Sequence, residues 1–191
     1  TIEQCAKLEE QGKKEQAVLP VHIALDTGMG RIGIQVEKED ALSIAETIFS
    51  ANHLEVAGIF SHFASCDETD KRYTLMQKTR FHHFLEQLKE RGYTVPLCHI
   101  SNSAGILEDI GTEYNMVRDG IVLYGIYPSK EVRQELPIKM ALSWKAKISH
   151  IKEVPAGEGI SYGSTFVTER LTRVATIPVG YGDGYPRILS G

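Results

Sequence analysis

The chain has 191 residues, 42% of them hydrophobic and 24% charged, which is the composition of an ordinary folded protein of one or two domains. A formal net charge of −4 excludes the strongly basic surface of a nucleic-acid-binding protein, and no apolar run approaches the ~20 residues of a membrane-spanning helix. Three widely spaced cysteines argue against a disulfide framework or a zinc site, and we expect no metal site. Together with the lack of a signal-peptide pattern, they predict a cytoplasmic protein with reduced thiols.

Strands and helices are predicted to alternate over the first two thirds of the chain. Apolar runs at residues 21–26 (VHIALD), 56–62 (VAGIFSH) and 97–101 (LCHIS) predict buried strands, and residues 115–125 contain another strand-like stretch. A short helix is predicted to begin at SAGIL. Longer amphipathic helices are predicted at 38–51 and about 70–91, with apolar faces formed by Ala41, Ile44, Ala45 and Ile48 and by Phe81, Phe84, Leu85 and Leu88. This alternation predicts parallel strands and an α/β fold.

The pattern changes near residue 138. Residues 141–154 (ALSWKAKISHIKEV) alternate with a period of two through Leu142, Trp144, Ala146 and Ile148, and no amphipathic segment of helix length follows. The sequence therefore predicts an α/β domain over residues 1–138 and the start of a β domain over residues 139–191.

Polar residues follow the predicted strands. Arg31 ends a glycine-rich turn (DTGMGR), His62 closes the second strand, Ser103 follows the third, and Arg118 lies inside the fourth. Four βα units are half of a (β/α)₈ barrel, where the carboxyl ends of the strands carry the chemistry, so this placement favours a partial barrel over an open doubly wound sheet. Each position also has a structural interpretation: a plain turn, a hydrogen-bonded core histidine, a helix N-cap, or an ion pair with Asp119.

Two more glycine-rich segments lie in the predicted β domain. GEGISYGST places Tyr162 between glycines, and GYGDGYPR carries Tyr181 and Arg187. A tyrosine in a turn is commonly surface packing, and a catalytic tyrosine needs a nearby cation to lower its pKa from about 10.

Six segments, in order and spacing, resemble the bacterial alanine racemase family: DTGMGRIG, HFASCDE, HISNSAG, NMVRDGIVLYG, GISYGSTF and PVGYGDGYPR. The resemblance implies a pyridoxal 5'-phosphate (PLP) enzyme with an N-terminal (β/α)₈ barrel and a C-terminal β domain. It also implies the interconversion of L- and D-alanine by two bases on opposite faces of the substrate, an isomerase reaction that supplies D-alanine for the peptidoglycan of the cell wall.

The resemblance implies roles around the cofactor. Arg118 hydrogen-bonds the pyridine nitrogen of PLP and keeps it unprotonated, which makes the ring a weaker electron sink. Ser103 holds the phosphate together with the backbone of Gly120 and Ile121, and Asn102 belongs to the same motif.

Further implied roles concern the substrate. Tyr162 is one of the two bases and reaches the active site of a partner subunit, which implies a homodimer. His62 lies between Arg118 and this tyrosine. Arg31 contacts the phenolic side of PLP and the substrate carboxylate, which suits a guanidinium fork. The corridor by which substrate enters is lined by Asp67, Tyr181 and Arg187.

The sequence departs from the family pattern in two ways. No residue matches the lysine that forms the Schiff base with PLP, which in the family lies in the first barrel strand. We therefore expect these 191 residues to belong to a longer protein and to be inactive alone. Many members also carry a lysine, modified to a carbamate, two residues before the aspartate of DTGMGR. Here that position is Ala24, so water, an anion or another side chain must orient Arg31.

Three alternatives remain open. One is a serine or broad-specificity amino-acid racemase of the same fold. Another is a non-catalytic PLP-binding protein, which would need neither the β domain nor Tyr162. The third is an unrelated barrel hydrolase that uses His62 and Asp67, which would leave Arg118, Ser103 and Tyr162 without a role.

Overall fold

The computed structural model describes residues 2–189, which fall into two compact units that divide between Ala141 and Leu142. Across these described residues, the helices are too short or too polar to cross a membrane.

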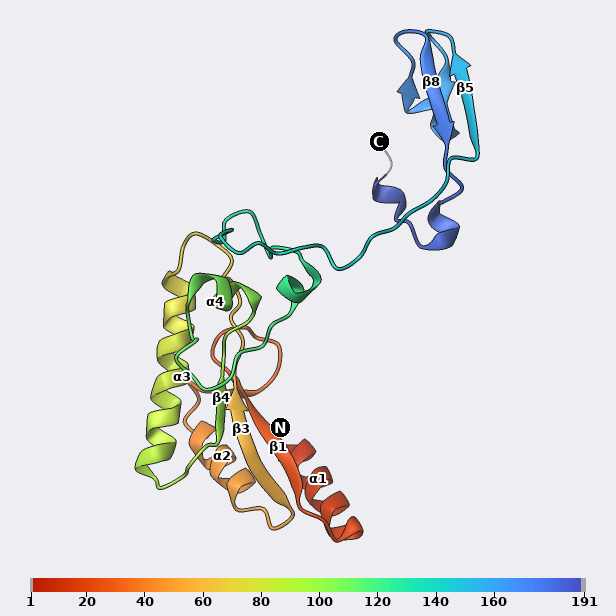
Figure 1. The fold of residues 1–191 in the computed structure, drawn as a ribbon. Coiled ribbons are helices and arrows are strands. Elements are labelled where there is room, and N and C mark those ends of the chain that lie inside the picture. The colour runs from red at the N-terminus through yellow and green to blue at the C-terminus, as the bar shows by residue number, and fades with distance from the viewer. Residues whose placement is uncertain (1, 190–191) are drawn as a thin grey trace. The chain divides into compact units, whose positions relative to one another are not determined.

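The first unit is built on a parallel sheet with strand order β2-β1-β3-β4 (Figure 1). Its strands are β1 (Leu19–Asp26), β2 (Ile34–Gln35), β3 (Leu54–Phe60) and β4 (Leu97–His99). The helices are α1 (Ile2–Glu15), α2 (Ala41–Phe49), α3 (Arg72–Glu90) and α4 (Ser103–Glu108). The predicted alternation of strands and helices is confirmed as far as residue 108.

The core of this unit lies between one face of the sheet and the helices. Ile23 and Leu25 of β1 and Ile59 of β3 are buried there. The apolar faces predicted for α2 and α3 are confirmed, because Ala41, Ala45, Ile48, Phe81, Phe84 and Leu88 are buried, and Ile44 and Leu85 are partly buried against the same core. The opposite face of the sheet carries His22, Phe60 and His99, whose rings contact one another.

The strand predicted within residues 115–125 is wrong. Residues 115–120 form no strand, and Ile121–Tyr124 is a short 3₁₀ helix, η1. Isolated hydrogen bonds, and no β-ladder, hold this segment against residues 96–101 of the same unit. The Asn115 side chain accepts from Cys98 N and donates to Pro96 O, and Arg118 N donates to Ser101 O at 3.1 Å. Arg118 therefore lies on a loop.

The second unit consists of two antiparallel pairs. β5 (His150–Val154) pairs with β8 (Thr172–Thr176), and β6 (Gly159–Ile160) pairs with β7 (Phe166–Val167). Its other elements are the 3₁₀ turns η2 (Tyr162–Ser164), η3 (Tyr181–Asp183) and η4 (Arg187–Leu189). The predicted alternation over residues 142–148 forms no strand, and Leu142, Trp144 and Ile148 are exposed because no described strand pairs with this segment.

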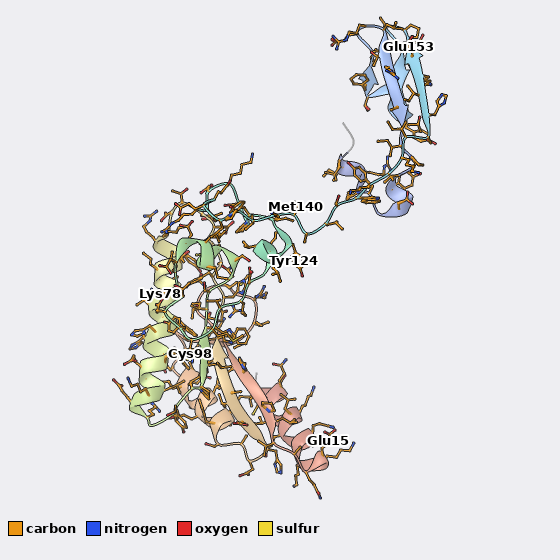
Figure 2. All side chains as sticks on the ribbon, viewed as in Figure 1. Glu15, Lys78, Cys98, Tyr124, Met140 and Glu153 are labelled. Atoms are coloured by element: carbon orange, nitrogen blue, oxygen red, sulfur yellow. The ribbon has the colours of Figure 1, made fainter. Side chains whose placement is uncertain are left out.

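Exposed side chains of the first unit carry surface ion pairs. Lys78 of α3, labelled in Figure 2, contacts Glu113 at 2.7 Å. Such exposed pairs contribute little to stability, so the packed core and the buried polar contacts below decide how the unit folds.

Candidate functional site

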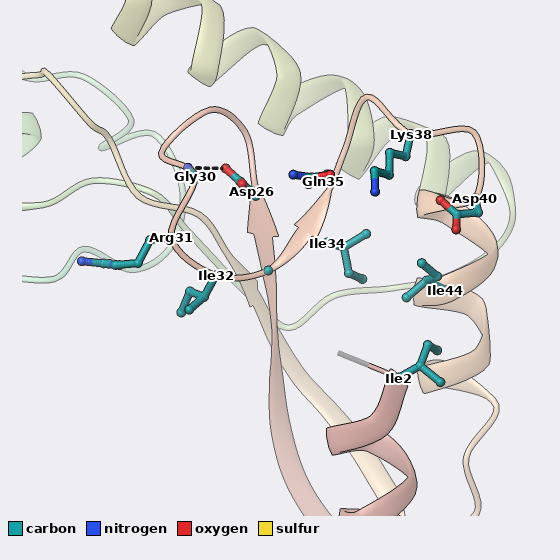
Figure 3. A pocket seen from close by; sticks show the side chains of 11 residues that line it. Ile2, Asp26, Gly30, Arg31, Ile32, Ile34, Gln35, Lys38, Asp40 and Ile44 are labelled. Carbon is teal, nitrogen blue, oxygen red and sulfur yellow. Dashed lines mark hydrogen bonds between the residues drawn. The ribbon is translucent and has the colours of Figure 1, made fainter.

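The glycine-rich turn after β1 is organised by the carboxylate of Asp26. Its Oδ1 accepts from Gly28 N and Gly30 N, both at 3.0 Å. Figure 3 shows the bond from Gly30. Gly28 and Gly30 have φ of 136° and 69°, a region that L side chains rarely adopt. The turn carries Arg31, whose side chain points away from Gln35 and Lys38 in Figure 3. Arg31 lines the pocket drawn in Figure 3 and also lines a smaller pocket with Phe60, Ser61 and His62.

Arg118 lies at the centre of a cluster at the carboxyl ends of β3 and β4. One terminal nitrogen donates to Ser61 O at 2.7 Å and contacts His62 Nδ1 at 3.1 Å. The other contacts His99 Nδ1 and donates to His99 O at 3.3 Å. The guanidinium also lies over the Phe60 ring, 5.4 Å from its centroid.

These contacts commit the four terminal N–H groups of Arg118. An arginine has five N–H donors and no acceptor. Within residues 2–189, the Nε–H is the guanidinium donor left without a hydrogen bond. The site therefore offers one oriented, charge-assisted donor to a ligand.

The contacts of Arg118 also fix the tautomers of two histidines. Because arginine can only donate, Nδ1 of His62 and Nδ1 of His99 must each accept. Neutral His99 then carries its proton on Nε2, which donates to His22 Nδ1 at 2.9 Å. Neutral His62 likewise carries its proton on Nε2. This Nε2 lies 3.4 Å from Asn102 Nδ2, which is itself a donor, so the proton remains available to another acceptor.

The electrostatics favour neutral imidazoles. Burial, followed by the charges of Arg118 and Arg31, lowers the pKa of His62. Burial, followed by Arg118 and His22, lowers the pKa of His99 from 6.5 to about 4. Two permanent cations, Arg118 and Arg31, thus lie near each other at this edge of the sheet, which suits an anionic ligand.

A second cluster lies where β4 leads into α4. Ser103 Oγ accepts from Gly120 N at 3.0 Å and from Val122 N at 3.4 Å, so its own O–H can still be donated. A Cβ on Gly120 would lie 3.3 Å from this oxygen. Asn102 is the N-cap of α4, because its Oδ1 accepts from Gly105 N at 3.0 Å. The backbone N–H of Ile121, the residue after Gly120, belongs to the same segment. The cluster brings together donors suited to a phosphate group.

Asp67 lies on the loop between β3 and α3, which is tied to a distant segment of the same unit. Asp67 O accepts from Ser129 Oγ at 2.8 Å, and Glu131 Oε2 accepts from both N and Oγ1 of Thr69 at 2.7 Å. Among the described residues, the Asp67 carboxylate does not contact His62.

The remaining predicted residues lie in the second unit. Tyr162 is 92% exposed, between Ser161 and Gly163, whose φ values are 62° and 73°. Arg187 lies over the ring of Tyr181, 5.9 Å from its centroid. The structure thus pairs Tyr181 with Arg187 and displays Tyr162 on a turn.

Sequence reasoning did not identify three residues of the first cluster. His99 lies in the HISNSAG motif, but the motif does not indicate that its ring contacts Arg118. Ser61 contributes a backbone carbonyl, which no side-chain pattern reveals. Gln77 is a polar residue on the buried face of α3 and is 0% exposed, a sign of a buried hydrogen-bonding role.

Comparisons with known proteins agree on one family. The model "Alanine racemase, N-terminal domain" matches residues 1–128, and "Alanine racemase, C-terminal domain" matches residues 141–191. The alanine racemase of Halothermothrix orenii is 44% identical over 188 residues, 98% of this chain and 49% of the relative. The chain thus spans about half the length of the curated relatives it matches.

Solved structures give the same result. An alanine racemase of Clostridium difficile 630 superposes with a TM-score of 0.87 at 38% identity, over 100% of this chain and 50% of that one. The enzyme from Bartonella henselae, with covalently bound pyridoxal phosphate, gives 0.79 at 30% identity, over 97% of this chain and 49% of that one. The predicted fold class, part of a (β/α)₈ barrel followed by the start of a β domain, is confirmed.

Proposed function

The chain belongs to the alanine racemase family, and we propose that it takes part in the PLP-dependent interconversion of L- and D-alanine in the cytoplasm. The observation that carries this proposal is the arrangement of Arg118. Its terminal N–H groups are bound to His62, His99 and two carbonyls, which leaves Nε–H as a single aimed donor.

The described residues fit PLP. The phosphate suits the cradle of Ser103, Gly120 and Ile121, with Asn102 shaping the start of α4. The pyridine nitrogen suits the Nε–H of Arg118. When bound, PLP withdraws electrons from the substrate Cα and makes its proton acidic. A permanent cation opposite the ring nitrogen keeps that nitrogen unprotonated, so Arg118 limits the electron withdrawal and disfavours transamination.

His62 and Tyr162 supply proton transfer in this proposal. Neutral His62 accepts from Arg118 at Nδ1 and presents Nε2–H. That proton can be donated to the phenolic oxygen of a tyrosine, which stabilises the phenolate, lowers the tyrosine pKa and makes more of the unprotonated base available near neutral pH. Tyr162 is exposed and contributed to the site of a partner subunit in a homodimer, where it serves the L-alanine face. A lysine outside these 191 residues serves the other face.

Substrate recognition is assigned to the glycine-rich turn and the corridor. Arg31 binds the substrate carboxylate as a planar fork. It lies beside His62 in the same pocket, which is where a carboxylate would complete the charge balance. The corridor by which substrate enters is assigned to Asp67, Tyr181 and Arg187.

The activity test uses the complete protein that carries the Schiff-base lysine. Purified protein loaded with PLP should convert L-alanine to D-alanine, measured with D-amino-acid oxidase. Serine and lysine assayed in parallel decide between an alanine racemase and a broader amino-acid racemase. Binding of PLP without turnover of any amino acid would refute the racemase and favour a non-catalytic PLP-binding protein.

The Arg118 assignment has its own test. Arg118→Glu should increase the release of pyruvate from alanine, because a carboxylic acid can protonate the ring nitrogen and favour transamination. Lactate dehydrogenase detects the pyruvate. A pyruvate yield per turnover equal to that of the unsubstituted protein would refute the contact with the pyridine nitrogen.

A further inference from the structure

Gln77 is a polar residue in the middle of α3 and is 0% exposed. A buried carboxamide is costly unless its donors and acceptor are hydrogen-bonded. Here Oε1 accepts from Ala64 N at 2.9 Å, while Nε2 donates to His62 O at 2.9 Å and to Thr27 Oγ1 at 3.3 Å. Both amide protons and the oxygen of this side chain are therefore hydrogen-bonded to two loops, which follow the carboxyl ends of β1 and β3.

Two of these bonds fix the backbone that carries the His62 imidazole. His62 O and Ala64 N lie on either side of Phe63, so the carboxamide binds the loop at two points directly after His62. The other side-chain bond to this stretch is weaker, because Asn102 Nδ2 reaches Phe63 O at 3.4 Å.

The third hydrogen bond, to Thr27, connects Gln77 to a series of hydrogen-bonded residues that leads through Ser61 to Arg118. Ser61 Oγ donates to Leu25 O at 2.8 Å, so in its 2.7 Å contact with Thr27 Oγ1 it accepts. Thr27 in turn accepts from Gln77. The backbone oxygen of Ser61 accepts from Arg118 at 2.7 Å. Gln77 thus holds the backbone of His62 directly, and through Thr27 it holds Ser61, which binds Arg118.

The same helix face binds the glycine-rich turn. Tyr73, Gln77 and Arg80 follow one another at helical spacing on α3. Tyr73 Oη donates to Gly28 O at 2.6 Å, and Arg80 donates to Thr27 O at 3.3 Å. This face reaches the loop that carries Arg31 and the loop that carries His62.

We propose that Gln77 is a positioning residue of the racemase, which sets the His62 imidazole against Arg118 through the backbone of residues 61–64. The inference rests on the proposed function for its effect on catalysis. The effect of Gln77 on the position of His62 is inferred from the hydrogen bonds alone, so it can be measured without any assay of racemase activity.

The test compares two buried positions of α3 in the complete protein. Gln77→Met keeps the length of the side chain and removes all three hydrogen bonds. The matched control is Thr74→Val. Thr74 is also 0% exposed, one turn earlier on α3, and its Oγ1 makes no hydrogen bond among the described residues.

The first readout is hydrogen exchange of the PLP-free protein, followed by mass spectrometry on peptides that contain Ala64. Loss of the Gln77 acceptor should speed exchange of the Ala64 amide roughly 2- to 10-fold, and Thr74→Val should leave it unchanged. Equal exchange in all three proteins would overturn the proposal.

The second readout separates kcat from KM in the PLP-loaded protein. Gln77→Met should lower kcat roughly 10- to 100-fold, because small displacements of catalytic groups are costly. KM for L-alanine should change little, because the proposed carboxylate ligand is Arg31. A variant with faster Ala64 exchange and unchanged kcat would show a structural role only and overturn the positioning role.

A third readout does not depend on racemase activity. His62 faces the guanidinium groups of Arg118 and Arg31, whose charges lower its pKa together with burial. Displacing His62 in Gln77→Met should therefore raise its pKa in an imidazole NMR titration, with the signal assigned by His62→Asn. An unchanged titration would overturn the proposal even if the protein proves not to racemise alanine, which would by itself refute only the proposed function.

Discussion

The cluster around Arg118 and the turn that carries Tyr162 show opposite ways of building a site. Arg118 is bound by two histidine rings, two carbonyls and an aromatic face, so its geometry is fixed before any ligand binds. Tyr162 is 92% exposed on a turn with left-handed residues at 161 and 163. A fixed group can serve its own subunit, whereas the exposed Tyr162 fits the role that we propose for it in the site of a partner subunit.

The strongest way to test this contrast is Tyr162→Phe in the complete protein. Removing the phenolic oxygen should lower kcat from L-alanine by roughly 10²- to 10⁴-fold, the usual value of a general base. The melting temperature should not change, because the exposed side chain makes no hydrogen bond within the described residues. Turnover near that of the unsubstituted protein in both directions would refute the role of Tyr162.

A glycine substitution sharpens the contrast in packing. A Cβ on Gly58 of β3 would lie 2.6 Å from His22 Cε1 and 2.7 Å from Leu97 O, so Gly58→Ala should destabilise the protein by about 1–3 kcal/mol through overpacking. The control is Gly182→Ala in the second unit, where nothing lies within 4 Å. Urea unfolding measures both, and equal stabilities would contradict the crowding at Gly58.

The two histidines bound to Arg118 predict a pH dependence of stability. The folded pKa of His99 is about 4, against 6.5 for the ordinary side chain. Between these values the unfolded chain binds a proton that the folded chain does not, so stability falls as the pH drops from 6.5 to about 4 and levels off below. The lowered pKa of His62 acts with the same sign.

His99 should contribute on the order of 2 kcal/mol to this loss. His99→Asn removes the titrating ring and keeps an acceptor near Arg118, so the loss between pH 6.5 and 4 should be smaller than in the unsubstituted protein. Urea midpoints at several pH values measure it. The same loss in both proteins would show that His99 does not titrate as described.

The smallest expected change in stability comes from removing one of two carboxylates that organise turns. Asp26 accepts two backbone N–H bonds at 3.0 Å, whereas Asp183 in the second unit accepts one, from Gly180 N at 3.0 Å. Asp26→Ala should therefore cost about 1 kcal/mol, and Asp183→Ala about half of that. Melting temperatures rank the two, and a larger loss for Asp183→Ala would contradict the greater ordering of the Arg31 turn.

Local sequence patterns were enough to predict the buried faces of two helices and the family of this protein. The apolar spacing of α2 and α3 predicted their buried faces, because a helix repeats every 3.6 residues whatever surrounds it. Six short motifs were enough to identify the family. They named Arg118, His62 and Ser103 as site residues because each motif keeps its order along the chain.

Tertiary structure alone decided how these residues are fixed. The strand expected around Arg118 is a loop, because the backbone there is bound by the Asn115 side chain and one amide and forms no ladder. The hydrogen bonds of Gln77 to residues 27, 62 and 64, and of Arg118 to Ser61 O, join segments far apart in sequence. Such contacts depend on where parallel strands end together in space, and the periodicity of a single chain does not record that.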